Sequence, residues 1–164
     1  MSEDQQLTGA ERVAAAARRL GLEHEVVRHG PAASLAEAAA ARGIEPRQLV
    51  KTMVVRVSAG DHRFLLVPGD RQISWPRLRA LLAVNRLTMA SADEAFEVTG
   101  YRRGTITPLG SRTALPVIAD TRVRGRISVG AGEPGAGLSV DADDLVAAVG
   151  AQVADVTEPA GDGA

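Results

Sequence analysis

The sequence predicts a mixed α/β fold, in which helices flank a sheet within one domain. Three observations support this prediction. The 164 residues are close to the usual length of a single domain, about 100–150 residues, and no long linker or internal repeat divides them. Helical and strand patterns intermix along the chain. Several strands also follow one another as hairpins, which a regular βαβ array does not contain.

The helices are predicted from their start signals. Three Ser/Thr-x-x-Glu boxes occur, in which a hydroxyl and a carboxylate each accept a hydrogen bond from an otherwise free amide of the first turn. Two further residues, a serine and an aspartate, precede helical patterns as candidate N-caps. The predicted caps are Thr8, Ser34, Ser74, Ser91 and Asp141. The helices are expected to end near Gly21, Gly43, Val84, Gly100 and Ala148.

The strands are predicted where β-branched and apolar residues run between turn signals. The clearest pair is the hairpin of residues 49–57 and 63–67, joined through a Ser-Ala-Gly-Asp turn. Further strands are expected at residues 25–28, 86–89, 116–120, 126–129, 137–140 and 153–156. The two chain ends are polar, so residues 1–7 are predicted to be flexible and residues 157–164 to be a disordered tail.

The composition excludes several classes of protein. Apolar residues make up 45% of the chain but aromatic residues only 2%, too few for the stacking platforms that read unpaired bases. A net charge of -1 gives no global basic surface, and we expect no DNA partner. The absence of cysteine excludes disulfides and thiolate chemistry. No apolar run is long enough to span a membrane and no signal peptide opens the chain, so we expect a soluble, cytoplasmic protein.

Lys51 is the only lysine, and the other 18 basic residues are all arginine. Lysine carries a compact ammonium whose pKa changes on burial, whereas arginine is a planar and permanently charged fork. A narrow pocket that needs a small cation, or an amine that can lose its proton, therefore requires lysine. The alternative is that one lysine survived an arginine-favouring codon bias on the surface. The Lys51-Thr52 pair stands at the entrance of a predicted central strand.

The segment Gly100–Gly110 is the second candidate for chemistry. It contains three glycines and a proline, which indicates a shaped loop rather than a helix or strand. Within it, Gly104–Pro108 combines a glycine that permits close approach, two hydroxyls and a stiffening proline. Such a loop can present amide donors to a carbonyl or carboxylate, or it can be an ordinary surface connection. The neighbouring Arg102-Arg103 pair can meet a phosphate or simply keep the loop soluble.

The sequence gives no sign of a metal site or cofactor. His24 and His29 flank a predicted strand, and His62 is expected in a turn, so none has the spacing of metal ligands. Neither the phosphate-binding Gly-x-x-x-x-Gly-Lys-Ser/Thr loop nor the Gly-x-Ser-x-Gly elbow of serine hydrolases is present. We therefore expect no metal and no cofactor.

The order of these features resembles one known family. A Lys-Thr pair at a strand start, a Gly-Tyr-x-x-Gly-x-x-x-Pro-x-Gly loop about fifty residues later and a strand ending in aspartate are similar to the YbaK/prolyl-tRNA-synthetase-associated editing domains. The resemblance covers nearly the whole chain, from about His24 to Val156. It implies a single domain over residues 8–156 with a curved, mostly antiparallel mixed sheet surrounded by helices.

The resemblance also implies an activity. Members of this family hydrolyse the ester that joins a wrong amino acid to tRNA, so the expected function is that of a stand-alone trans-editing deacylase. Its substrate would be a small amino acid such as Cys, Ala, Ser or Thr on a tRNA such as tRNA-Pro. The expected partners are the acceptor end of the mischarged tRNA and an aminoacyl-tRNA synthetase that delivers it. The protein itself would be a monomer or weak homodimer.

By the same resemblance, Lys51 is the catalytic residue, acting by its charge or by proton transfer. The remaining implied site residues are expected to bind substrate or shape the pocket, and they are Thr52, Tyr101, Gly104, Thr105, Ile106, Thr107, Pro108, Gly110 and Asp120. Two other functions stay open: a non-catalytic module that keeps the pocket to bind a small molecule or protein, and a hydrolase of a different small ester.

Overall fold

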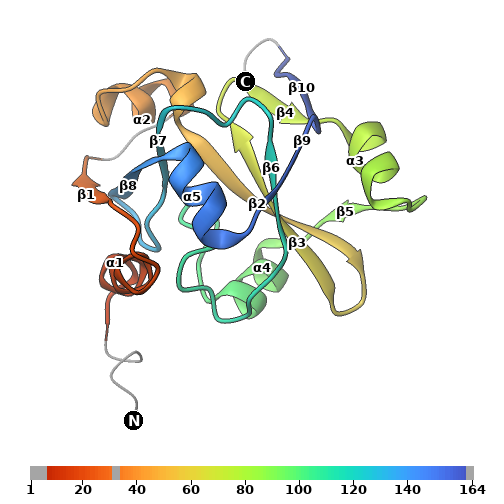
Figure 1. Ribbon diagram of the computed structural model, residues 1–164, viewed down its shortest axis with the longest axis horizontal. Coiled ribbons are helices and arrows are strands. Elements are labelled where there is room, and N and C mark those ends of the chain that lie inside the picture. Colours follow the sequence, from red (N-terminus) through yellow and green to blue (C-terminus); the bar gives the residue numbers. More distant parts are fainter. Residues whose placement is uncertain (1–6, 31–33, 162–164) are drawn as a thin grey trace.

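The described part of the chain, residues 7–30 and 34–161 of the computed structural model, contains five α-helices, ten strands and a 3-10 helix (Figure 1). The helices are α1 (Gly9–Arg19), α2 (Leu35–Ala41), α3 (Trp75–Leu82), α4 (Ala92–Thr99) and α5 (Ala142–Val149), and the 3-10 helix is Pro46–Gln48. The strands are β1 (Glu25–Arg28), β2 (Val50–Ser58), β3 (Asp61–Pro68), β4 (Arg71–Ile73), β5 (Thr88–Met89), β6 (Val117–Asp120), β7 (Arg126–Gly130), β8 (Ala136–Asp141), β9 (Gln152–Ala154) and β10 (Thr157–Pro159).

The strands divide among three sheets. The central sheet has the order β5-β2-β3-β6-β9, the second has the order β1-β8-β7, and β10 and β4 form a small ribbon. Only the pairings β3–β6 and β6–β9 are parallel, and the others are antiparallel. The predicted mixed α/β class with mostly antiparallel strands is confirmed. A bridge between Leu49 and Ser128 connects the start of β2 to β7 of the second sheet.

The two faces of the central sheet bury different sets of side chains, because successive residues of a strand point to opposite faces. On β3, Phe64 and Leu66 belong to a core shared with α1, α5 and the β1-β8-β7 sheet. Leu65 and Val67 belong to a second core that Leu78 of α3 completes. The sheet thus lies between α3 on one side and the second sheet with its helices on the other, as the arrangement in Figure 1 shows.

Four of the five predicted N-caps bond as expected. The side chains of Thr8, Ser34, Ser91 and Asp141 each accept a hydrogen bond from the amide three residues later. Ser74 precedes α3 but makes no side-chain cap bond. The physical reason lies in Pro76, which removes one of the two amides that a cap residue can bond.

The C-terminal prediction is wrong in part. Thr157–Pro159, expected in a disordered tail, pairs with β4 in a strand of its own. Both strands have three residues, too few to show a two-residue alternation in the sequence, and the pairing joins segments far apart in the chain. The rest of the predicted tail includes residues 162–164, which lie outside the described residues, as do residues 1–6 of the predicted flexible N-terminus.

His62 is also misplaced by the sequence prediction, which put it in a turn. It is a buried residue of β3, and its Nε2 lies 2.6 Å from Oε2 of Glu94 on α4. The hairpin turn is shorter than expected, because β3 begins at Asp61. This contact ties the central sheet to the helix that follows β5.

Candidate functional site

One edge of β2 borders a cavity. β3 pairs with one edge of β2 along its length, whereas β5 pairs with the other edge only at Val55 and Arg56. Before that point the second edge faces a cavity of about 640 Å³, a size typical of small-ligand sites at about 300–1,000 Å³. Its walls come from α2, β2, the β5–α4 segment, the loop after α4 and β7. They comprise Ala38, Arg42, residues 49–54, residues 89–92, Ala95, Arg103, Gly104, Ile106 and Gly130.

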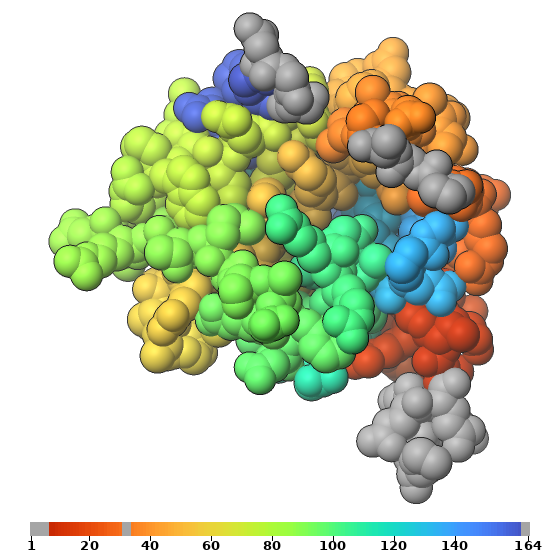
Figure 2. All heavy atoms as spheres, turned by 180° about the vertical axis from the view of Figure 1, so that it is seen from behind, coloured from red at the N-terminus to blue at the C-terminus, as the bar shows by residue number. Residues whose placement is uncertain are grey.

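Figure 2 shows this side of the molecule in space-filling form. The light-orange atoms of β2 are seen at the bottom of a hollow between α2 and the green segments around α4. The cavity is therefore open on this face of the molecule.

Lys51 lies at this cavity with most of its hydrogen-bonding capacity unused. Its Nζ donates one long bond, 3.5 Å, to the carbonyl of Arg71, although an ammonium carries three donors. Partial burial lowers the pKa of Lys51, and the carboxylate of Asp70 opposes that shift. No carboxylate lies within ion-pair distance of Nζ among the described residues. The charge therefore remains available to a ligand.

Thr52 contributes backbone groups to the cavity edge. The Val54 carbonyl accepts a hydrogen bond from Ala90 N–H at 3.0 Å, so the backbone groups of Val54 point away from β3. Backbone groups two residues apart point to the same strand edge, and the N–H and C=O of Thr52 therefore face the cavity side. The Oγ1 of Thr52 is buried and has no hydrogen-bond partner in the described part of the chain.

The loop after α4 forms the opposite wall through Gly104 and Ile106. Gly104 has φ +88°, a left-handed conformation that favours glycine. The Thr105 amide and hydroxyl both donate to the carbonyl of Arg102, at 2.9 and 2.7 Å, which closes a tight turn. The loop passes directly over β7, where a Cβ at Gly130 would stand 2.4 Å from the Ile106 carbonyl oxygen. The glycine at 130 therefore permits the approach.

Five predicted substrate-binding residues, all in the segment 101–110, do not line the cavity. They are Tyr101, Thr105, Thr107, Pro108 and Gly110. Tyr101 donates its hydroxyl hydrogen to the Leu109 carbonyl at 2.8 Å, and burial raises its pKa to about 12. Thr107 accepts a bond from the Leu109 amide at 3.3 Å. The hydroxyl groups of Tyr101, Thr105 and Thr107 therefore make hydrogen bonds within the loop segment.

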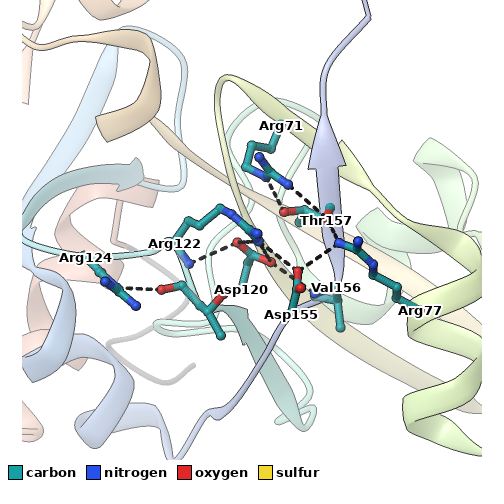
Figure 3. Close-up of polar contacts among 9 residues, drawn as sticks. Arg71, Arg77, Asp120, Arg122, Arg124, Asp155, Val156 and Thr157 are labelled. Carbon is teal, nitrogen blue, oxygen red and sulfur yellow. Dashed lines mark hydrogen bonds and ion pairs between the residues drawn. The ribbon is translucent and has the colours of Figure 1, made fainter.

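Asp120 is also away from the cavity. It is 1% exposed at the end of β6, and its carboxylate accepts bonds from the amides of Val156 and Arg122 at 3.1 and 3.0 Å. Figure 3 shows it within a group of polar residues around β9 and β10. Its partners join β6 to the segment that follows β9, which indicates a structural function.

Arg42 and Arg103 line the cavity, and sequence analysis did not assign Arg42 any function. Arg42 donates from Nη1 to Ser128 Oγ at 2.9 Å, while its Nε is buried without a partner among the described residues. Burial lowers the pKa of Arg42. Its guanidinium lies over Gly137, where a Cβ would be 2.9 Å from Cζ. Nothing in the local sequence marks Arg42, because it simply ends an alanine-rich helix.

The cavity is cationic. Its lining residues include Lys51, Arg42 and Arg103 and, among the described residues, no Asp, Glu or His. Cations and free backbone amides together stabilise anions and developing oxyanions. No cluster of three or more potential metal ligands occurs in the described residues. None of the described helices is both long and apolar enough to cross a membrane.

The family model of the aminoacyl-tRNA editing domain matches residues 29–148 of this chain. The chain is 32% identical over 101 residues to the proline–tRNA ligase of Bacillus licheniformis, covering 60% of this chain and 17% of the ligase. It is 36% identical over 78 residues to that of Lactobacillus gasseri, covering 46% of this chain and 14% of the ligase. The chain thus spans about a sixth of the length of these curated relatives.

Two solved structures share the fold. One is described as a proposed trans-editing enzyme for prolyl tRNA synthetase, 31% identical, with a TM-score of 0.83 over 96% of this chain and 99% of that one. The other is a hypothetical protein, 30% identical, with a TM-score of 0.83 over 90% of this chain and 100% of that one.

Proposed function

Because the chain belongs to the family of aminoacyl-tRNA editing domains, we propose that it is a hydrolase that deacylates mischarged tRNA in trans, like the proposed trans-editing enzyme whose fold it shares. The observation that carries this proposal is the chemistry of the cavity. The only lysine of the chain and two arginines line the cavity, and no carboxylate lines the same walls among the described residues. Such a site suits a substrate that becomes more negative during reaction.

The proposed step is attack of water on the ester carbonyl. The carbon–oxygen bond to the tRNA ribose breaks, the amino acid leaves as its carboxylic acid, and the ribose oxygen takes the proton. An aminoacyl ester is already activated, so positioning and oxyanion stabilisation suffice. Lys51 supplies the positive charge, and the Thr52 amide and the Gly104 loop supply donors.

In this proposal the substrate itself orients the attacking water. Among the described cavity-lining residues there is no histidine or carboxylate that could accept the proton of the attacking water. The free hydroxyl of the terminal ribose lies next to the ester in any aminoacyl-tRNA and can orient that water. The protein then contributes geometry and charge rather than proton transfer.

Amino-acid choice would depend on size. The wall contains Ile106, Met53 and Val54, and an apolar pocket separates side chains differing by one methylene by only about 10–200-fold. A second, smaller pocket that hydrolyses the esters of the amino acids that fit into it corrects the errors of the synthetase. We propose a small amino acid, Cys, Ala, Ser or Thr. The similarity to proline–tRNA ligases supports tRNA-Pro, a synthetase that delivers it, and a cytoplasmic place of action.

The test is deacylation of tRNA-Pro charged with Cys, Ala, Ser or Thr, compared between the wild type and Lys51→Ala. We expect the wild type to release at least one of these amino acids and Lys51→Ala to lose about 10²–10³-fold in rate, while its unfolding midpoint in urea stays unchanged. If the wild type releases nothing above background, the protein is a binding module. If it hydrolyses free amino-acid esters equally well, tRNA is not its substrate.

A further inference from the structure

A second hollow lies beside the cavity and is lined mainly by arginines. Its volume is about 430 Å³, and we call it the arginine cleft. It is formed by Arg47, Pro68, Asp70, Arg71, Thr121, Arg122 and Arg124. Four guanidinium groups therefore face one carboxylate in the lining, on a protein whose net charge is only -1. The positive charge is concentrated locally rather than spread over the surface.

The cleft and the cavity meet at Lys51. The Lys51 ammonium donates to the carbonyl of Arg71, which lines the cleft. Asp70, the carboxylate of the cleft, is also the group that opposes the lowering of the Lys51 pKa. Val50, which lines the cavity, pairs with Pro68, which lines the cleft, so the two hollows lie on either side of the β2–β3 pair near Lys51. A chain-like ligand could occupy both hollows at once.

Two of the arginines are held in place without losing their charge to an ion pair. Arg71 donates from Nε to Thr157 Oγ1 at 2.7 Å and from Nη2 to the Thr157 carbonyl at 3.1 Å. Arg124 donates from Nε to the Thr121 carbonyl at 2.8 Å, and Figure 3 shows both contacts. Among the described residues no carboxylate lies within ion-pair distance of either. Both are fixed by neutral oxygens and remain available to an anion.

The other two arginines are already paired. Arg122 lies 2.8 Å from Asp155 and 3.4 Å from the buried Asp120, and Arg47 lies 2.7 Å from Glu45. Arg71 also interacts electrostatically with Asp155, so Arg124 carries the least compensated charge of the cleft. Charge held by neutral partners before binding reduces the ordering cost that a ligand must overcome.

We propose that the arginine cleft binds phosphodiester groups of the tRNA acceptor end while the aminoacylated terminus occupies the cavity. The inference rests on the proposed function and assigns the RNA backbone a specific place. Guanidinium forks match phosphate geometry. None of the four aromatic residues lines the cleft, so the contact reads backbone rather than bases.

Arg124→Gln is the most direct test, because Arg124 is exposed and its side chain bonds, within the described part of the chain, only to a backbone carbonyl. An RNA minihelix that has the acceptor stem of tRNA-Pro and carries no amino acid is titrated against the wild type and the variant over a range of salt concentrations. We expect roughly tenfold weaker binding at low salt. The slope of log affinity against log salt should fall by about 1.

Arg19→Gln is the matched control. Arg19 is an exposed arginine of α1, which lies at the opposite end of the molecule from β4 and β10 in Figure 1. The Arg19→Gln substitution removes one positive charge, as Arg124→Gln does. Any change in binding that is common to both variants therefore reflects net charge alone. Equal affinity and slope in Arg124→Gln and Arg19→Gln would overturn the inference.

Two further outcomes distinguish RNA binding in the cleft from binding of a free anion and from the proposed deacylase function. If inorganic phosphate binds in an Arg124-dependent way while minihelix binding does not depend on Arg124, the cleft holds a free anion and the inference is wrong. If wild-type protein binds the minihelix through Arg124 but hydrolyses no aminoacyl-tRNA, the proposed function fails while the RNA contact stands. The minihelix carries no amino acid, so the binding measurement does not depend on catalysis.

Discussion

Lys51 and Asp120 both belong to the central sheet, yet their surroundings differ in every respect that matters for function. Lys51 on β2 is half-buried beside a cavity and makes one long hydrogen bond. Asp120 on β6 is 1% exposed and accepts bonds from two backbone amides and from Arg122. The Lys51 ammonium can still donate hydrogen bonds at an open cavity, whereas the Asp120 carboxylate already accepts its hydrogen bonds from groups inside the protein.

The contrast separates two kinds of residue that sequence analysis had placed in one site. A buried charge whose hydrogen bonds are all internal stabilises the fold, and its removal leaves unpaired partners. A charge that faces a cavity contributes little to the fold and is available to a substrate. Activity and stability should therefore respond oppositely to substitution at these two positions.

The strongest test of the comparison is Lys51→Arg. This change keeps the charge but replaces a compact ammonium with a larger planar group, so we expect kcat/KM for the edited aminoacyl-tRNA to fall about 100-fold or more. The free energy of unfolding in urea should stay within about 0.5 kcal/mol of the wild type. Full activity in this variant would mean that lysine was retained at position 51 by codon bias alone.

Asp120→Ala should give the reverse pattern. The Val156 and Arg122 amides lose their acceptor and Arg122 loses a partner, so we expect a loss of about 3 kcal/mol in unfolding free energy. The folded fraction should keep the wild-type kcat/KM, measured at a temperature well below the transition. Asp155→Ala, which removes a half-exposed partner of the same Arg122, is the control and should cost far less. Lost activity in fully folded Asp120→Ala would place Asp120 in the site after all.

Gly130→Ala probes the contact between the two regions of the cavity wall. The new Cβ would meet the Ile106 and Thr105 carbonyl oxygens at 2.4 and 2.8 Å, so the loop must move. We expect a stability loss of about 1–3 kcal/mol together with reduced kcat, since the loop carries Gly104. Gly30→Ala, at a position with no atom of the described residues within 4 Å of the added carbon, should be neutral. Equal behaviour of the two variants would show that the loop tolerates displacement.

Arg42→Gln tests whether a second cavity cation acts on binding alone. Among the described residues its Nε has no partner and its Nη1 bonds only to Ser128, so we expect a KM about tenfold higher with kcat nearly unchanged. Arg42→Lys should recover only part of the loss, because the fork geometry is gone. A fall in kcat with constant KM would instead place Arg42 in transition-state stabilisation.

The smallest expected effect concerns Glu94, which is paired with His62 close to the cavity wall. The hydrogen bond from His62 is the main cause that lowers the pKa of Glu94 from its ordinary 4.5, and Arg56 adds to it. A lowered folded-state pKa means that this stabilisation is present above the unfolded-state pKa and is lost as pH falls through the folded one.

Wild type should therefore exceed Glu94→Gln in unfolding free energy at neutral pH, and the gap should close as the pH is lowered below 4.5. Urea unfolding across this range measures the gap. Glu97→Gln, on the exposed side of the same helix, is the matched control. A gap that persists in strong acid would show that the His62–Glu94 contact acts through packing rather than charge.

Local signals in the sequence located most of the elements. Side-chain N-caps at Thr8, Ser34 and Ser91 begin helices as predicted, because a cap bond joins residues three apart. The β2–β3 hairpin follows from its turn and its apolar runs. The three-residue strands β4 and β10 carry no such signal, since each exists only through its pairing with the other.

The site divides in the same way. The sequence by itself determined the mixed α/β class, a unique lysine at a strand entrance and a glycine-rich loop, because these depend on local pattern and composition. Only the tertiary structure decided that Arg42 and Arg103 share the cavity with Lys51 and that Arg71 and Arg124 gather in a cleft. The tertiary structure likewise decided that the carboxylate of Asp120 accepts a hydrogen bond from the amide of Val156. Hydrogen bonds between distant segments leave no periodic trace in the chain, so the function of each charge depends on which partners folding brings to it.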